Sequence, residues 1–220
     1  MIASLLIKED ILPLTLNDNI EEALSRMNDY KVSHFPVSDN GRFIGIIAEK
    51  DILSLDNKYA ELQKECLHFE NYYVNSQQYI FDIIKMASNQ KLTIIPVVDD
   101  SGGYVGCITH DAIIDFFAVS MAVDNPGGVV VLEVSINDYS LTEIANIVET
   151  NDAKVLSSYI VSNINSTKIE VIIKVSKIDI GAILQTFERY GYPILASFQE
   201  KIDYDEIKGN YDSLINYLNI

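Results

Sequence analysis

The chain has 220 residues, 48% of them apolar, which is enough to fill one large core or two modest ones. The formal net charge of −16 comes from 32 acidic and 16 basic residues, and such a field argues against nucleic acid and membranes as partners. No apolar run is long enough to cross a bilayer and no signal segment opens the sequence, so we expect a cytoplasmic protein.

The cysteines and histidines form no pattern typical of a metal or catalytic site. Cys66 and Cys107 lie in unlike contexts without metal-ligand spacing, and Cys107 sits in an apolar strand, as a small core residue does. His68 and His110 are separate in the sequence and form no ligand cluster. We therefore predict that the protein is not an enzyme, holds no metal and requires no cofactor.

The first elements follow the order strand, helix, strand, strand, helix. After an extended segment at 12–16, Asn17-Asp18 is expected to cap a helix whose apolar face recurs at helical spacing. Two strands are predicted at 32–37 and 43–48, and the Asn40-Gly41 pair between them is typical of a tight hairpin turn. A second helix is expected to start near Asp51.

Most of the sequence at 31–51 is repeated at 91–111. The matching pairs are Pro36 and Pro96, Val37 and Val97, Asp39 and Asp99, Gly45 and Gly106, and Ile47 and Ile108. The helix preceding the stretch is repeated as well, and an acidic connecting segment at 55–72 lies between the copies. Such a repeat indicates one supersecondary unit used twice.

The two copies resemble a tandem pair of CBS domains, with the first at 1–60 and the second at 61–123. The resemblance rests on an apolar strand, Pro-Val, an acidic turn, Gly-Ile-Ile and a helix, occurring twice at this spacing. It implies a pseudo-twofold regulatory module of two β-α-β-β-α repeats, whose clefts often hold AMP, ATP or S-adenosylmethionine. It implies no catalysis.

The first copy carries the better candidate cleft for an adenosyl ligand. The resemblance implies a Ser/Thr-x-x-Asp segment at the start of each second helix. The corresponding segment of the first copy is Ala48-Glu-Lys-Asp51. The carboxylate of Asp51 suits a ribose diol and Lys50 suits a phosphate, although the hydroxyl is missing. His34 and Pro36 complete this candidate site, and helix capping by Asp51 is the competing explanation.

The second copy reads Thr109-His-Asp-Ala112, so the hydroxyl is present but the carboxylate of Asp111 comes one position early. A shift of one residue turns a helical side chain by roughly 100°, away from the direction of Asp51. Thr109, Asp111 and Pro96 are therefore candidates for a weaker cleft, and we expect at most one strong site per chain. Capping by Asp111 is the favoured alternative.

A second domain is expected at 129–200, after the linker 124–128 with its proline and paired glycines. Apolar strands and helix faces follow one another in the order strand, helix, strand, strand, helix, strand. This is the ferredoxin-like βαββαβ order, so the chain as a whole is predicted to combine α/β and α+β parts. The tail at 201–220 carries apolar residues at alternating spacings of three and four, typical of an amphipathic helix.

The domain at 129–200 resembles an ACT domain, through Leu141-Thr-Glu-Ile-Ala145 and Gly191-Tyr192 before the last strand. That family often binds amino acids through a loop containing Asp-x-x-Gly, whose glycine permits close approach of a ligand. Here the candidate loop residues are Asp138, Tyr139 and Ser140, without glycine. The absence of glycine from this loop favours a structural or dimerising role of the domain over amino-acid binding.

The combination resembles CBS proteins of the acetoin-utilisation type. We expect a homodimeric regulator in which an adenine nucleotide (AMP or ATP) or S-adenosylmethionine reorients the ACT-like domain. Two alternatives remain: an amino-acid-binding ACT regulator, and a ligand-free scaffold that dimerises and recruits an unknown protein partner.

Overall fold

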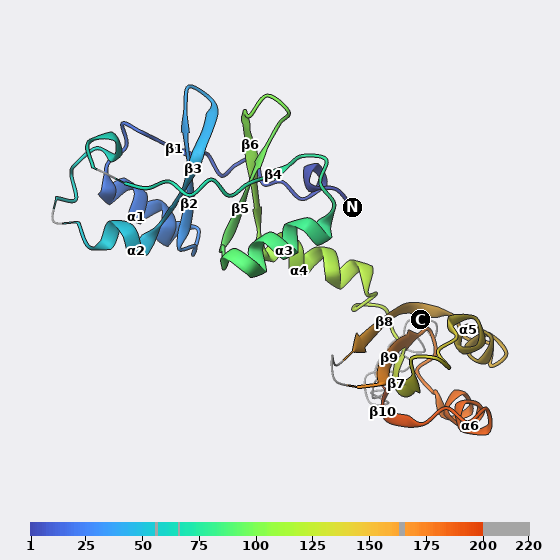
Figure 1. Ribbon diagram of the computed structural model, residues 1–220. Helices are drawn as coiled ribbons and strands as arrows, with labels where there is room; N and C mark the ends of the chain where they lie inside the picture. Colours follow the sequence, from blue (N-terminus) through green and yellow to red (C-terminus); the bar gives the residue numbers. More distant parts are fainter. Residues whose placement is uncertain (56, 66, 163–165, 200–220) are drawn as a thin grey trace, which may run out of the picture. The chain divides into compact units, whose positions relative to one another are not determined.

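The computed structural model describes residues 1–55, 57–65, 67–162 and 166–199 (Figure 1). The chain divides into two compact units, Met1–Phe116 and Phe117–Ile220. The amphipathic helix predicted at 201–220 lies outside the described residues. Within them, no helix is long and apolar enough to cross a membrane.

The first unit contains the same order of elements twice. The first copy consists of η1 (Ala3–Leu5), β1 (Leu14–Thr15), α1 (Ile20–Asp29), β2 (His34–Asp39), β3 (Arg42–Ala48) and α2 (Glu49–Leu53). The second consists of η2 (Leu62–Lys64), β4 (Val74–Asn75), α3 (Ile80–Gln90), β5 (Ile94–Val98), β6 (Tyr104–Thr109) and α4 (His110–Ser120). The predicted repeat of strand, helix, strand, strand, helix is therefore present.

Each copy builds a three-stranded sheet, with strand orders β1-β2-β3 and β4-β5-β6. The short first strand runs parallel to the second, and the second and third form an antiparallel hairpin. The hairpin of the first copy turns at Asn40 and Gly41, whose φ angles of 49° and 79° are those of the predicted tight turn. Both hairpins shift register at the same point, after Val37 and after Val97.

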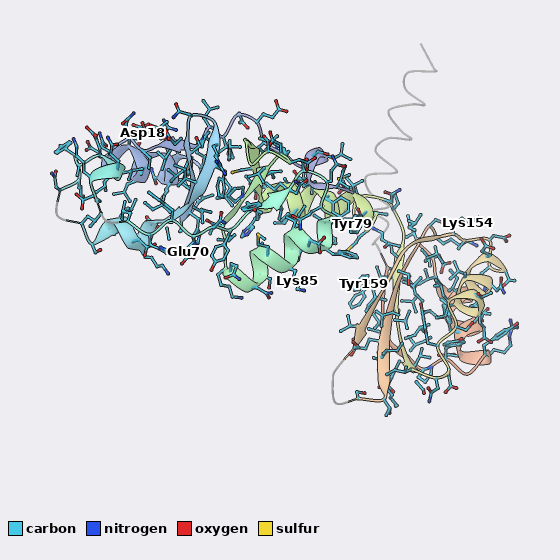
Figure 2. The ribbon with its side chains drawn as sticks, turned by 45° about the horizontal axis from the view of Figure 1, so that its top comes forward. Asp18, Glu70, Tyr79, Lys85, Lys154 and Tyr159 are labelled. Atoms are coloured by element: carbon cyan, nitrogen blue, oxygen red, sulfur yellow. The ribbon has the colours of Figure 1, made fainter. Side chains whose placement is uncertain are left out.

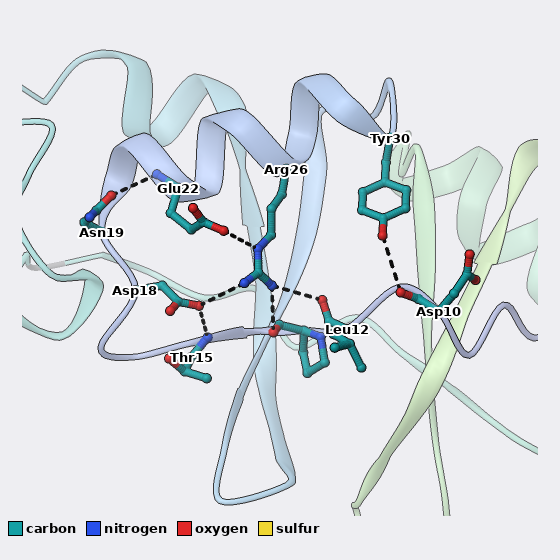
Figure 3. Close-up of polar contacts among 9 residues, drawn as sticks. Asp10, Leu12, Thr15, Asp18, Asn19, Glu22, Arg26 and Tyr30 are labelled. Carbon is teal, nitrogen blue, oxygen red and sulfur yellow. Dashed lines mark hydrogen bonds and ion pairs between the residues drawn. The ribbon is translucent and has the colours of Figure 1, made fainter.

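The cap of α1 differs from the prediction by one or two residues. Asn19, not Asn17-Asp18, is the N-cap, and its side chain accepts a hydrogen bond from the Glu22 amide at 2.8 Å. Asp18 instead accepts from the Thr15 amide at 2.8 Å and so fixes the approach to the helix (Figure 3). A run of neighbouring Asn and Asp residues offers several caps, and the backbone path selects among them.

Arg26 ties α1 to the extended segment that precedes it (Figure 3). Its guanidinium donates to Glu22 at 2.8 Å and to the carbonyl of Pro13 at 3.3 Å. Asp18 lies 4.0 Å away and completes an ion-pair network at the surface. The segment before β1 is therefore held against the helix by polar contacts as well as by its buried apolar residues.

The two copies are interlocked, because each one pairs with the segment that leads into the other. Lys8 pairs with Cys107 in β6, and Glu70, on the connecting segment, pairs with Ile46 in β3. Figure 1 shows the connecting segment, in teal, passing from the first sheet to the second. The arrangement is pseudo-symmetric, since Ile46 and Cys107 occupy matching positions after Gly45 and Gly106 in the two hairpins.

Gly45 makes the crossing sterically feasible. A Cβ atom at that position would lie 2.7 Å from the Cβ of Phe69 and 2.9 Å from the carbonyl oxygen of Glu70. At the matching position, a Cβ on Gly106 would meet the side chain of Ile7 and lie 3.0 Å from the Lys8 carbonyl. Both glycines therefore allow a foreign segment to pair closely with the hairpin.

The cores of the first unit also join the copies. One cluster contains the apolar faces of α1, β2 and β3 together with Leu92, Ile94 and Cys107 from the second copy. The other gathers the faces of α3, β5 and β6 and includes Ala3 and Leu6 from the N-terminal segment. Cys107 is fully buried, as its sequence context predicts.

The second unit has the predicted βαββαβ order, with both helices covering the buried face of its sheet (Figure 1). Its elements are β7 (Gly128–Ser135), α5 (Leu141–Glu149), β8 (Val155–Ser162), β9 (Lys168–Val175), α6 (Gly181–Arg189) and β10 (Ile194–Gln199). The antiparallel sheet has the order β10-β7-β9-β8. Alternating burial along β7 places Val130, Leu132 and Val134 in the core.

Candidate ligand site

The first unit encloses a cavity of about 580 Å³, whose walls come from both copies and from the connecting segment. Its lining residues are His34, Ile46, Ala48, Lys50, Asp51, Ser54, Leu55, Leu67, His68, Glu70, Tyr72, Gln90 and Leu92. The apolar members suit a flat ring, and the charged members suit the polar parts of a ligand. Three of the residues predicted from the first copy, Asp51, Lys50 and His34, are thus brought together.

Lys50 and Asp51 lie in the first turn of α2, and both are exposed toward the cavity. Neither the ammonium nor the carboxylate forms a hydrogen bond or ion pair with another described residue. The N-cap of α2 is Ala48, and Asp51 does not cap the helix. Both charges therefore remain available to a ligand, and capping does not explain the carboxylate.

His34 begins β2 and is half-buried at the cavity wall. Its Nδ1 accepts from the Thr93 amide at 3.3 Å and lies 3.1 Å from the Thr93 hydroxyl, so the neutral ring carries its proton on Nε2. Burial and the nearby Lys50 lower the pKa of His34 below its ordinary value, against the opposing effect of Asp51. His34 is therefore a neutral hydrogen-bond donor at neutral pH.

The connecting segment supplies cavity residues that sequence reasoning missed. Glu70, labelled in Figure 2, is held beside β3 by its paired backbone bonds to Ile46 of 2.8 and 3.0 Å. The His68 ring lies 3.8 Å from the Glu70 carboxylate, and Tyr72 follows on the same segment. No periodicity marks these residues, and the paired glycines Gly45 and Gly106 were the one sequence signal that a segment crosses here.

The remaining predicted residues lie elsewhere. Pro36 and Pro96 are buried in their sheets, opposite Ile46 and Cys107. The Thr109 hydroxyl accepts from the Ala112 amide at 3.2 Å and so caps α4, and its use by a phosphate stays a prediction. Asp111 is exposed in the first turn of α4 and does not line the cavity.

Two tyrosines, one from each copy, tie the end of α1 and the strand β6 to the N-terminal segment. The Tyr30 hydroxyl donates to the Asp10 carbonyl at 3.3 Å (Figure 3), and the Tyr104 hydroxyl donates to the Ile11 carbonyl at 2.8 Å. The Cys107 sulfur lies 3.0 Å from the Tyr104 oxygen, and burial raises the pKa of its thiol to about 12. The counterparts of Tyr30 and Tyr104 in the repeat are Gln90 of the second copy and Phe43 of the first; Phe43 has no hydroxyl, and Gln90 lines the cavity.

The three candidate loop residues of the second unit make different contacts. Asp138 lines a cavity of about 380 Å³ together with Glu133, Glu143, Lys168 and other residues near the start of α5. Tyr139 packs against the core, and the Ser140 hydroxyl caps α5 by accepting from the Glu143 amide at 3.3 Å. Among the described residues of the chain, no group of three or more His, Cys, Asp or Glu could hold a metal ion.

Tyr192 and Glu143 form a short side-chain contact at this second cavity. The Tyr192 hydroxyl donates to the Glu143 carboxylate at 2.6 Å. Burial and this bond to a carboxylate raise the pKa of Tyr192 above its ordinary value. The pair is satisfied without a ligand.

Residues 2–58 and 68–119 match the sequence model of the CBS domain family. The similarity covers both copies of the repeat, and this part of the chain is a tandem pair of CBS domains. Such a pair is generally a regulatory, ligand-sensing fold. The likeness of the second unit to ACT domains stays a prediction.

Two curated proteins are similar over the CBS pair. Homoserine O-acetyltransferase of Methanobrevibacter ruminantium is 29% identical over 109 residues, which are 49% of this chain and 22% of that protein. Inosine-5'-monophosphate dehydrogenase of Methanocaldococcus jannaschii is 24% identical over 102 residues, 46% of this chain and 20% of that protein. The chain thus spans about a fifth of the length of these relatives.

A solved structure similar to part of the chain is a CBS domain pair/ACT domain protein of Thermotoga maritima. The two share 19% identity with a TM-score of 0.48, over 53% of this chain and 96% of that one.

Proposed function

We propose that the CBS pair binds one adenosyl compound per chain, in the cavity of the first copy. The observation that carries the proposal is that the Asp51 carboxylate and the Lys50 ammonium both line this cavity without a partner in the described chain. An exposed carboxylate and ammonium beside an apolar wall suit the diol, phosphate and base of a nucleotide.

Each part of the ligand has a complementary group in the cavity. Asp51 accepts from both hydroxyls of the ribose, and Lys50 faces the phosphate as a point charge. The purine ring lies against apolar residues such as Ile46 and Leu92. His34 offers its Nε2–H as a neutral donor, which suits a ring nitrogen or a ribose oxygen.

Binding becomes regulation if the ligand prefers one packing of the two copies over another. The cavity is walled by both copies and by the segment that interlocks them, so a ligand there contacts both copies at once. We propose that this preference is transmitted to the ACT-like second unit of a homodimer and changes its orientation. The shift cannot exceed the difference in affinity between the two arrangements.

Calorimetric titration of the purified chain with AMP, ATP, adenosine and S-adenosylmethionine tests the proposal. We expect at least one of these to bind with a stoichiometry of one per chain and to raise the melting temperature. Asp51→Ala should weaken binding by roughly 10- to 100-fold, because charge-assisted hydrogen bonds to the diol are lost. The matched variant Asp111→Ala should bind as the wild type does, and absence of binding by all four ligands contradicts the proposal.

A second candidate function is amino-acid binding by the second unit. The cavity of about 380 Å³ places the loop residue Asp138 beside Glu143 and Lys168, and such a mixture of charges suits an amino acid's ammonium and carboxylate. The ion pair between Lys168 and Glu133 and the bond between Tyr192 and Glu143 compete with that use.

A thermal-shift screen with the common amino acids separates the two functions. Stabilisation by an amino acid that is lost in Asp138→Asn would favour the second candidate. Stabilisation by nucleotides alone, lost in Asp51→Ala, favours the first.

A further inference from the structure

We infer that the first-copy cavity discriminates among adenosyl ligands by charge, taking S-adenosylmethionine, adenosine and AMP in preference to ATP. The inference rests on the proposed function, because it concerns the ligand of that same site. It follows from the fixed charges of the side chains around the cavity. It also follows from one pair of matching positions on the two crossing segments, where one side chain is acidic and the other is basic.

The cavity holds little positive charge. Among the described residues that line it, Lys50 is the only lysine or arginine, whereas Asp51 and Glu70 are both carboxylates. If Asp51 holds the ribose, Lys50 can neutralise about one phosphate and no cation remains for a second or third. A triphosphate would add its outer charges to a surface whose overall formal charge is already −16.

Glu70 is the residue that sets this balance. Its backbone is bonded to both the amide and the carbonyl of Ile46, so the side chain cannot withdraw from the cavity by a shift of the connecting segment. The position matching Glu70 on the interlocking N-terminal segment is Lys8, which pairs with Cys107 in the same way. The two crossing segments therefore carry opposite charges at matching positions, and the segment beside the open cavity carries the negative one.

The fixed charges that line the cavity are those of Lys50, Asp51 and Glu70. The His68 side chain is largely exposed, and its ring lies 3.8 Å from the Glu70 carboxylate. The cationic sulfonium and ammonium groups of S-adenosylmethionine are attracted by Glu70, whereas additional phosphates are repelled by it.

The test compares dissociation constants for AMP and ATP by isothermal titration calorimetry at pH 7.5, without magnesium and with chelator, since magnesium would mask the phosphate charge. We expect ATP to bind at least about ten-fold more weakly than AMP, and S-adenosylmethionine at least as tightly as AMP. Glu70→Lys should reduce the difference between AMP and ATP by roughly ten-fold, and Glu70→Gln by about half that factor on a logarithmic scale.

The control is Glu21→Lys, which makes the same change in net charge at an exposed position on α1 outside the cavity. It should leave the ratio of the two dissociation constants unchanged. ATP binding as tightly as AMP to the wild type, or a Glu70→Lys ratio equal to that of the wild type, overturns the inference while leaving nucleotide binding itself intact. If no adenosyl compound binds, both the proposed function and this inference are contradicted.

Discussion

The two copies of the CBS pair share a frame but finish their clefts differently. Tyr30 of the first copy and Tyr104 of the second bond the carbonyls of the N-terminal segment, whereas their counterparts in the repeat are Gln90 and Phe43. Gln90 lines an open cavity of about 580 Å³. A repeated fold therefore does not imply a repeated site, because a few side chains decide whether a crossing segment is tied down by side-chain hydrogen bonds or borders an open cavity.

The largest expected effect breaks the frame that both copies share. Gly45→Ala would place a Cβ atom 2.7 Å from Phe69 and 2.9 Å from the Glu70 carbonyl, so the connecting segment must move away from β3. We expect the free energy of unfolding to fall by about 2–3 kcal/mol, measured by urea denaturation. Nucleotide binding should weaken as well, because the moved segment carries one wall of the cavity.

Gly106→Ala is the matched change in the second copy. It should destabilise the protein by a similar amount, since its Cβ would meet Ile7 and lie 3.0 Å from the Lys8 carbonyl. Ser25→Ala, on the exposed face of α1, should leave stability within about 0.5 kcal/mol of the wild type. Equal stability of Gly45→Ala and Ser25→Ala would show that the crossing is not closely packed.

The second prediction makes the first cleft resemble the second. Gln90→Tyr introduces at the first cavity the side chain that reaches the N-terminal segment in the other copy. We expect the affinity for AMP to fall about ten-fold, because the ring occupies space needed by the ligand. The variant should retain the melting temperature of the wild type within a few degrees.

Calorimetric titration measures this loss, and Gln90→Ala serves as the control that enlarges the cavity. Unchanged affinity in Gln90→Tyr would mean that the tyrosines do not explain the difference between the clefts.

The third prediction makes the second cleft resemble the first. Tyr104→Phe removes the hydroxyl that joins the Ile11 carbonyl to Cys107, and phenylalanine is the residue present at the matching position, Phe43. We expect the free energy of unfolding to fall by about 1–2 kcal/mol, since a part-buried carbonyl loses its partner. Urea denaturation measures the change, and AMP affinity at the first cavity should be unaltered.

The smallest expected effect is a pH dependence carried by His34. Because the pKa of His34 is lowered in the folded state from 6.5, the unfolded chain takes up the proton first on acidification. Its contribution to stability is therefore complete above pH 6.5 and is lost as the pH falls below that value. Between pH 7.5 and 5.5 the wild type should lose roughly 1–2 °C more in melting temperature than His34→Asn.

Asparagine is chosen because its Oδ1 can accept from the Thr93 amide as the ring Nδ1 does. If the melting temperatures of the two proteins fall by the same amount between pH 7.5 and pH 5.5, protonation of His34 is not coupled to folding. At pH 5.5 AMP binding should also change less in the variant than in the wild type.

The sequence was sufficient to predict local structure where local chemistry decides it. Helical spacing placed α1 and α3, Asn40-Gly41 placed the first hairpin, and apolar runs placed the strands of the second unit. Asp51 and Lys50 line one cavity, and their role in ligand binding stays a prediction.

What could not be predicted depends on contacts between distant segments. Glu70 reaches the cavity because the connecting segment crosses to β3, and Gln90 does so from the end of α3 in the other copy, and nothing in the neighbourhood of either residue encodes these placements. The Thr109 hydroxyl caps α4, a contact that its sequence alone leaves open.

The crossing segments also affect how the first unit acquires its structure. The bond between Tyr104 and Ile11 joins residues 93 positions apart, and the pairing of Lys8 with Cys107 spans a similar length of chain. Closing such a loop costs entropy before its contacts form, which slows folding relative to a protein with local contacts. Each sheet edge is completed by a segment that belongs to the other repeat, so we expect the pair to fold in one cooperative step and to resist division into separate repeats.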